Sequence, residues 1–124
     1  MSRQEIELVV DDFERAKQFI EALGYEVWVF YEKYRTTYEL NVFHIMLDEL
    51  PYGDFVEIEG ENISSIHEIA IKLGLKWETA ITASYHALFE RVAKTRGLDK
   101  NQLTFAAFGE TKPSAEELSI ARAD

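Results

Sequence analysis

The chain contains no cysteine, so it can form no disulfide and can bind no metal through thiolates. Proline and glycine are also scarce, with 2 and 6 residues, while 47% of the residues are hydrophobic, which is typical of a folded chain. No apolar run reaches the roughly 18 residues that a membrane-spanning helix needs. We therefore expect one cytoplasmic domain over residues 1–124, with no membrane partner.

Basic residues are in the minority: the chain has 13 Lys and Arg but 23 Asp and Glu, so its net charge is −10. A chain of this charge repels polyanions at long range, so nucleic acid is not an expected partner. A small phosphorylated ligand is compatible with this charge, since a few local cations and a bound divalent ion can outweigh the overall field inside a cleft.

The common nucleotide and zinc motifs are absent. The sequence has neither the glycine-rich loop of P-loop proteins nor the G-x-G-x-x-G turn of dinucleotide-binding folds. It also lacks the H-E-x-x-H spacing that places two histidines on one helix face for zinc. Phosphate binding would therefore have to come from side chains on strands.

Hydrophobic periodicity predicts a mixture of strands and helices. Aromatic and β-branched residues dominate residues 25–47, which favours a long hairpin with its reversal at residues 39–41. Trp28, Phe30 and Tyr34 should pack under the helices, and Ser65 has the spacing of a helix-capping residue. The other predicted elements are strands over 5–10 and 55–59 and helices starting near 13, 65 and 85 and ending at Gly24, Gly74 and Gly97, with 103–108 left ambiguous.

Acidic residues alternate along the predicted strand 55–59. Side chains two apart on a strand share a face, so Glu57 and Glu59 project together while Val56 and Ile58 point the other way. Two adjacent carboxylates repel each other unless a cation lies between them. Hard oxygen ligands of this kind suit a divalent metal such as Mg²⁺ or Mn²⁺ together with phosphate.

Cations alternate on the predicted hairpin in the same way. Lys33 and Arg35 would share one strand face, about 7 Å apart. On the partner strand, Asp48 continues an alternation that begins at Val42. If these side chains face Glu57 and Glu59, the result is three carboxylates for metal and two cations for phosphate oxygens. The alternative that periodicity leaves open is a set of cross-strand salt bridges on a solvated sheet face.

Several short motifs then follow one another in a specific order. They are Lys33-Tyr34-Arg35, Leu47-Asp48, Gly53-Asp54-Phe55-Val56-Glu57-Ile58-Glu59, Leu73-Gly74-Leu75 and Ser84-Tyr85. In combination they resemble the C-terminal half of the CYTH family, the triphosphate tunnel metalloenzymes, which includes class IV adenylate cyclases and thiamine triphosphatases. The resemblance covers roughly residues 3–89.

The resemblance implies an α+β fold with an antiparallel β tunnel that binds a triphosphate or nucleotide with Mg²⁺ or Mn²⁺. It places Lys33 and Arg35 on the phosphate-binding basic pair of the family, and Glu57, Glu59 and Asp48 on inward acidic positions that bind metal. It identifies no catalytic residue. If the chain is active, the resemblance implies a metal-dependent triphosphatase or an adenylate cyclase.

The N-terminal part departs from the family pattern. The family's first strand carries E-x-E-x-K, whereas Glu5-Ile6-Glu7-Leu8-Val9 ends in valine instead of lysine. We therefore expect a half-barrel that lacks the usual N-terminal strands, has helices on its outer face, and is closed by a two-fold homodimer. Two alternatives to an active enzyme remain. The chain is a module that binds phosphate and metal without turnover, or it is a truncated half-domain that needs another chain to complete the tunnel.

An internal repeat is consistent with two related halves. Glu5-Ile6-Glu7 leads to Leu23-Gly24, and Glu57-Ile58-Glu59 leads to Leu73-Gly74, over intervals of almost equal length. Glutamate and isoleucine are common residues and glycine often ends helices, so chance and duplication both explain the pattern.

Overall fold

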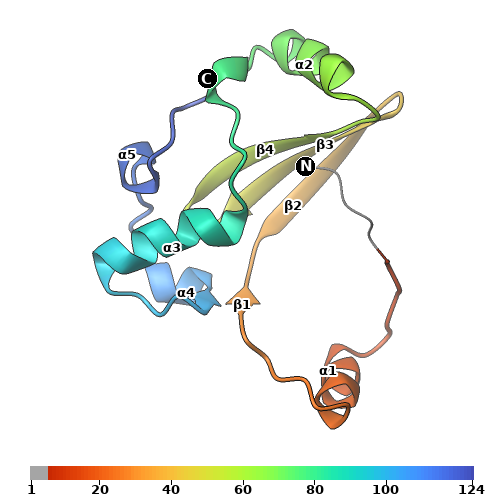
Figure 1. Cartoon of the computed structure of the whole chain (residues 1–124), viewed down its shortest axis with the longest axis vertical. Coiled ribbons are helices and arrows are strands. Elements are labelled where there is room, and N and C mark those ends of the chain that lie inside the picture. Colours follow the sequence, from red (N-terminus) through yellow and green to blue (C-terminus); the bar gives the residue numbers. More distant parts are fainter. Residues whose placement is uncertain (1–5) are drawn as a thin grey trace.

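The centre of the molecule is an open antiparallel sheet of three strands, seen in a computed structural model that describes residues 6–124. Strands β2 (Tyr34–Leu40), β3 (Phe43–Leu50) and β4 (Gly53–Glu59) lie side by side in that order (Figure 1). This architecture confirms the predicted α+β class and the antiparallel pairing. Within residues 6–124 the sheet does not close on itself.

The turn between β2 and β3 lies close to its predicted place. It is formed by Asn41 and Val42, and Asn41 adopts a left-handed conformation with φ of 55°. Asparagine tolerates this conformation better than most residues because its short polar side chain can bond locally. The turn fixes the register in which Arg35 lies opposite Asp48 and Met46 lies opposite Glu57.

Side-chain oxygens cap the three longer helices, α1 (Phe13–Ala22), α2 (Ile63–Lys72) and α3 (Tyr85–Arg96). Asp12, Asn62 and Ser84 each accept a hydrogen bond from a backbone N–H of the first turn, which satisfies a donor that has no partner inside the helix. The predicted cap at Ser65 is wrong, because Asn62 precedes it and accepts from the Ser65 N–H.

The first strand of the hairpin predicted over residues 25–47 is interrupted. Phe30–Tyr31 forms a short strand, β1, that pairs in parallel with β5 (Gln102–Leu103), and β2 begins only at Tyr34. The backbone N–H of Glu32 donates to Leu103 O at 2.9 Å. Lys33 therefore lies in the bend between β1 and β2.

The segment before α1 does not form the predicted strand. Glu5 lies outside the described residues, and residues 6–10 form no helix or strand and pair with no strand of the described chain. The remaining elements are short: η1 (Trp77–Thr79), α4 (Phe105–Phe108) and α5 (Ala115–Leu118).

Helices cover opposite faces of the sheet at its two ends. Ile66 and Ile69 of α2 pack against Phe43, Ile45 and Ile58 on one face. On the other face, Leu50 and Tyr52 share a larger core with residues of α3, α4 and α5. The expectation that all helices pack on the outer face is therefore wrong, since α3 covers the face that carries Asp48. The main buried residues of this larger core are Leu88, Phe89, Val92, Leu103, Phe108 and Leu118.

Three aromatic residues at the start of the predicted hairpin are not buried under helices as predicted. Trp28, Phe30 and Tyr34 are exposed, although the Trp28 ring lies 5.5 Å from the ring of His86 and the Tyr34 ring lies 5.2 Å from that of Phe105. Among the described helices, none combines the length and the apolar character that crossing a bilayer requires.

Candidate functional site

A buried carboxylate lies at the centre of the candidate site. Asp48, near the end of β3, is only 1% exposed and is the one charged residue in the core of the described chain. Its neighbours Leu50 and Phe55 on the same sheet face belong to or pack against the α3 core, which removes water from one side of the carboxylate. An ionised carboxylate in such a place needs cations and hydrogen-bond donors around it.

Arg35 supplies the strongest of these contacts from the adjacent strand. Because Arg35 and Asp48 are direct cross-strand partners, the guanidinium meets the carboxylate through two parallel hydrogen bonds, Nε to Oδ1 at 2.6 Å and Nη2 to Oδ2 at 2.5 Å. The same Nη2 donates to Glu57 Oε2 at 2.6 Å. Arg35 therefore joins the acidic residues of β3 and β4.

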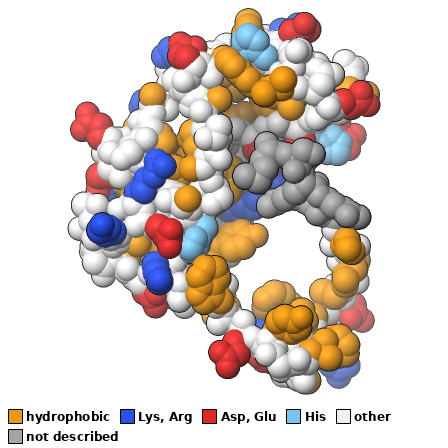
Figure 2. All heavy atoms as spheres, in the orientation of Figure 1, with side chains coloured by type: hydrophobic (Ala, Val, Ile, Leu, Met, Phe, Trp, Pro, Cys, Tyr) orange, Lys and Arg blue, Asp and Glu red, His pale blue; other side chains and the backbone are white. Residues whose placement is uncertain are grey.

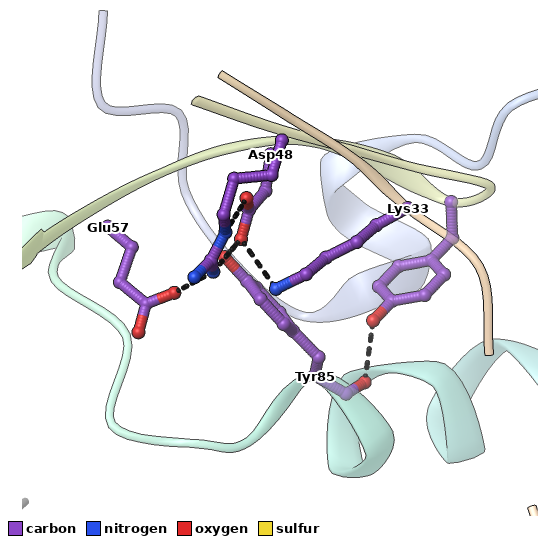
Figure 3. Close-up of polar contacts among 6 residues, drawn as sticks. Lys33, Asp48, Glu57 and Tyr85 are labelled. Atoms are coloured by element: carbon purple, nitrogen blue, oxygen red, sulfur yellow. Dashed lines mark hydrogen bonds and ion pairs between the residues drawn. The ribbon is translucent and has the colours of Figure 1, made fainter. Parts of the chain in front are cut away.

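Lys33 and Tyr85 complete the shell of Asp48 from outside the sheet (Figure 3). The Lys33 ammonium lies 3.3 Å from Asp48 Oδ2 and 5.6 Å from the centre of the Tyr85 ring. Tyr85, the first residue of α3, donates its hydroxyl to Asp48 Oδ2 at 3.0 Å. The Tyr52 hydroxyl in turn donates to Tyr85 O at 2.8 Å, which fixes the start of α3 over the site.

Glu57 and Glu59 project from the face of β4 that lies on the same side of the sheet as Asp48. The Glu57 side chain is 41% exposed, and its polar contact within residues 6–124 is with Nη2 of Arg35. Glu59 lies opposite His44, one pair further from Asp48, and is exposed. These two carboxylates are therefore accessible, whereas Asp48 is enclosed.

The environment of Asp48 shifts its titration. Burial disfavours the charged form, but hydrogen bonds from Arg35 and Tyr85 and the charges of Lys33 and Arg35 outweigh it, so the pKa lies below its ordinary value. The hydrogen bond to Asp48 also raises the pKa of Arg35, which keeps the guanidinium charged at every pH of interest. Burial, followed by the bond to Asp48, raises the pKa of Tyr85. Asp48 and Arg35 are therefore charged at neutral pH, and Tyr85 is a neutral donor.

Removing the Tyr85 hydroxyl should make the protein more sensitive to acid. A lowered carboxyl pKa contributes stability above the pKa of the unfolded chain, and this contribution is lost as the pH falls through the folded value. Tyr85→Phe deletes one donor, so we expect the Asp48 pKa to rise and the unfolding free energy at pH 7 to fall by about 1–2 kcal/mol.

Acid titrations followed by far-ultraviolet circular dichroism would measure this effect of Tyr85→Phe. The acid midpoint should move to higher pH. Tyr38→Phe, whose exposed hydroxyl lies on the other sheet face, is the control. An acid midpoint that Tyr85→Phe leaves at the wild-type pH would contradict the role of the hydroxyl.

The residues present could hold a Mg²⁺ or Mn²⁺ ion whose other ligands would be phosphate oxygens and water. Within residues 6–124, no three His, Asp or Glu side chains are grouped closely enough to bind a metal by themselves. Mg²⁺, however, is commonly held by one or two carboxylates together with water and phosphate oxygens. Glu57 and Glu59 offer two accessible carboxylates, while an ion at Asp48 would have to displace Arg35, Lys33 or Tyr85.

The structure thus brings four of the five sequence-predicted site residues into one cluster: Lys33, Arg35, Asp48 and Glu57. Glu59 lies on the same face, at a position further along β4. Tyr85 and Tyr52 were missed as site residues, because the helical spacing of Tyr85 predicts core packing. The signal for Tyr85 was present in the Ser84-Tyr85 motif.

The fold and the site define the class of this protein: an α+β domain whose antiparallel sheet carries paired acidic and basic side chains on one face. The sequence model of the CYTH domain matches residues 1–85, which include the whole cluster and all three strands of the sheet. The chain therefore belongs to the CYTH family. Comparisons with curated proteins and with solved structures give no significant match.

Proposed function

We propose that this chain binds a small triphosphate or nucleotide together with Mg²⁺ or Mn²⁺ on the face of the sheet that carries Asp48. Membership of the CYTH family supports a protein of the triphosphate-tunnel type. The observation that carries the proposal is the convergence of Lys33 and Arg35 on Asp48, beside the accessible carboxylate of Glu57.

In this proposal, Lys33 and Arg35 bind the phosphate oxygens. Arginine presents a planar set of donors that suits two oxygens at once, and lysine acts as a compact point charge. Asp48 and Tyr85 hold both cations in place, so the site is ordered before a ligand arrives, which lowers the entropic cost of binding.

Glu57 and Glu59 would hold the divalent ion. When bound, the ion would neutralise charge on the phosphates next to these carboxylates. The two cations of the cluster already face two carboxylates, Asp48 and Glu57, so their charges cancel before any phosphate binds. We therefore expect triphosphate binding to depend strongly on the metal, and we propose Asp48 as the counter-ion of the two cations.

Binding without turnover is the second candidate function, and the open sheet favours it. Catalysis of phosphoryl transfer depends on positioning and on charges placed around the transferred group. In the described chain the cluster contributes two cations from one side of an open surface. Hydrolysis or cyclisation would require a second surface, and we propose that another copy of this chain supplies it in a homodimer.

The Glu57→Gln substitution tests the binding site. Gln is close in size to Glu but cannot neutralise a metal ion, so we expect Mn²⁺-dependent binding of inorganic triphosphate to weaken at least about tenfold, or roughly 1.4 kcal/mol. Calorimetric titration of triphosphate into protein with Mn²⁺, and then without it, measures this change.

Glu49→Gln is a matched control, because Glu49 lies next to Asp48 in sequence but on the opposite face of β3. It should bind like the wild type. Equal affinities of the Glu57→Gln and Glu49→Gln variants would remove Glu57 from the site. Assays of ATP, thiamine triphosphate and inorganic triphosphate with Mg²⁺ or Mn²⁺ then separate an enzyme from a binding module, since only an enzyme consumes a substrate that it binds.

A further inference from the structure

Helices α1 and α2 have the same length and the same kind of cap at each end, and α1 lies fifty positions earlier in the chain. Asp12 and Asn62 cap the two helices in the same way, each accepting from the N–H three residues on. The helices have equal length and end at leucines with nearly identical backbone angles, φ −79° and ψ −1° at Leu23 and φ −80° and ψ −2° at Leu73. A glycine of positive φ follows in both cases. The helical part of the sequence repeat therefore recurs in the structure, whereas residues 6–10 form no strand like β4.

The two helices differ in what covers them. In α2, Ile69 and Ala70 are buried, and Ile66 and Ile69 pack on the sheet. The corresponding positions in α1 are Ala16, Phe19 and Ile20. Phe19 is 67% exposed and Ile20 is 51% exposed, and α1 has no buried residue. The apolar face of α1 therefore has the pattern of a helix that packs on a sheet, but it meets solvent.

The sheet has an uncovered patch of matching character. We define the open patch as Thr36, Leu47 and Val56, which form one cross-strand row next to the row that α2 covers through Ile45 and Ile58. Leu47 and Val56 are exposed apolar residues on a half-covered face. All seven residues of β2 are exposed, and β2 is the open edge beside this patch. A helix with an apolar face like that of α1 fits this surface.

The chain holds α1 away from its own open patch. Figure 1 shows α1 apart from the sheet, on an arm that leaves the body at β1 and whose part before α1 runs back toward the sheet, and Figure 2 shows hydrophobic side chains gathered on that arm. The root of the arm is fixed, because Phe30 N–H donates to Asn101 O and Glu32 N–H donates to Leu103 O. The arm includes residues 6–10, which form no helix or strand and carry four exposed apolar side chains (Ile6, Leu8, Val9 and Val10).

We propose that the arm docks on a second copy of this chain. The apolar face of α1 covers the open patch of the partner, and residues 6–10 pair with the open edge of the partner's β2. Because each chain carries both an arm and a patch, a two-fold exchange satisfies both copies and leaves no unmatched surface, whereas a one-way contact would continue into a filament. Large exposed apolar surfaces of this kind mark protein interfaces. This interface gives the proposed homodimer its contacts, and its test requires no ligand.

Introduced cysteines test the exchange directly, because the chain has none of its own. We would prepare Ala16→Cys in α1 and Val56→Cys in the open patch as separate full-length chains, mix them, and add a short bis-maleimide. The exchange predicts that the crosslinked product joins one chain of each kind, in clear excess over products that join two identical chains. A double variant that crosslinks only within a single chain would overturn the proposal, since α1 would then dock on its own sheet.

Oligomeric state provides the second measurement. Light scattering during size-exclusion chromatography should give a dimer for the wild type and a monomer for Ile20→Asp, whose exposed position disturbs no core. Ile71→Asp is the matched control, because Ile71 is exposed on the outward side of α2, and it should remain dimeric. A wild-type monomer, an open-ended polymer or an unchanged Ile20→Asp dimer would each overturn the proposal. A monomer that still binds triphosphate with Mn²⁺ would remove this interface and leave the proposed ligand site standing.

Discussion

Replacing Arg35 with leucine should lower the free energy of unfolding by about 3–5 kcal/mol, because the substitution leaves the buried Asp48 carboxylate without its principal partner. Arg35 makes two of the four polar contacts to Asp48 described above, both of them short. Lys33 remains nearby at 3.3 Å, so we expect the loss near the lower end of this range. Urea unfolding followed by far-ultraviolet circular dichroism measures it, and triphosphate binding should be lost at the same time.

Two further variants distinguish a buried ion pair from an ordinary surface one. Arg122→Leu breaks an exposed pair with Asp124, and it should change the unfolding free energy by at most about 1 kcal/mol. The double substitution Arg35→Leu with Asp48→Leu removes both charges and should recover much of the stability, since apolar residues often replace a buried pair without loss. If Arg35→Leu were as mild as Arg122→Leu, Asp48 would not depend on Arg35.

Phe89→Ala should cost about 3–5 kcal/mol of unfolding free energy, because it opens a cavity at the centre of the larger core. Phe89 is fully buried in α3 and its ring lies 5.9 Å from that of Tyr52 and 5.6 Å from that of Phe108. Since Tyr52 also anchors the start of α3, where Tyr85 contacts Asp48, we expect weaker triphosphate binding as well. Urea unfolding and calorimetry measure the two effects.

The controls for Phe89 compare volume and position. Phe89→Leu keeps most of the buried volume and should lose much less stability than Phe89→Ala. Phe30→Ala truncates a partly exposed ring of β1, and it should also be mild. Equal losses for Phe89→Ala and Phe30→Ala would contradict the view that α3 is fixed on the sheet by its core residues.

Local patterns were sufficient to predict the sheet and the convergence of charged residues in it. Alternation along β4 placed Glu57 with Glu59, and the hairpin reversal near Asn41 brought Arg35 opposite Asp48. These inferences succeeded because side-chain direction in a strand depends only on position, and because short turns fix the register of neighbouring strands. Lys33 reaches Asp48 from the bend before β2, so strand alternation does not account for its contact. The roles of these residues in binding metal and phosphate stay predictions.

The rest depended on contacts between distant parts of the chain. Trp28 and Phe30 have the composition of a buried strand, but β1 is short and pairs with Gln102–Leu103, whose sequence was ambiguous. The burial of Asp48 depends on α3 packing over its face of the sheet, and no residue near Asp48 indicates this. Tyr85 could be predicted only as part of a core helix, since periodicity cannot show that its hydroxyl reaches a carboxylate.

The parallel pairing of β1 with β5 also sets an order of folding. Strands β2, β3 and β4 are joined by tight turns, so they can assemble as soon as that part of the chain leaves the ribosome. β1 must wait until Gln102–Leu103 has been synthesised, because those residues supply its partner. Lys33 follows β1 after one residue, so we expect Arg35 to pair with Asp48 before Lys33 joins the cluster.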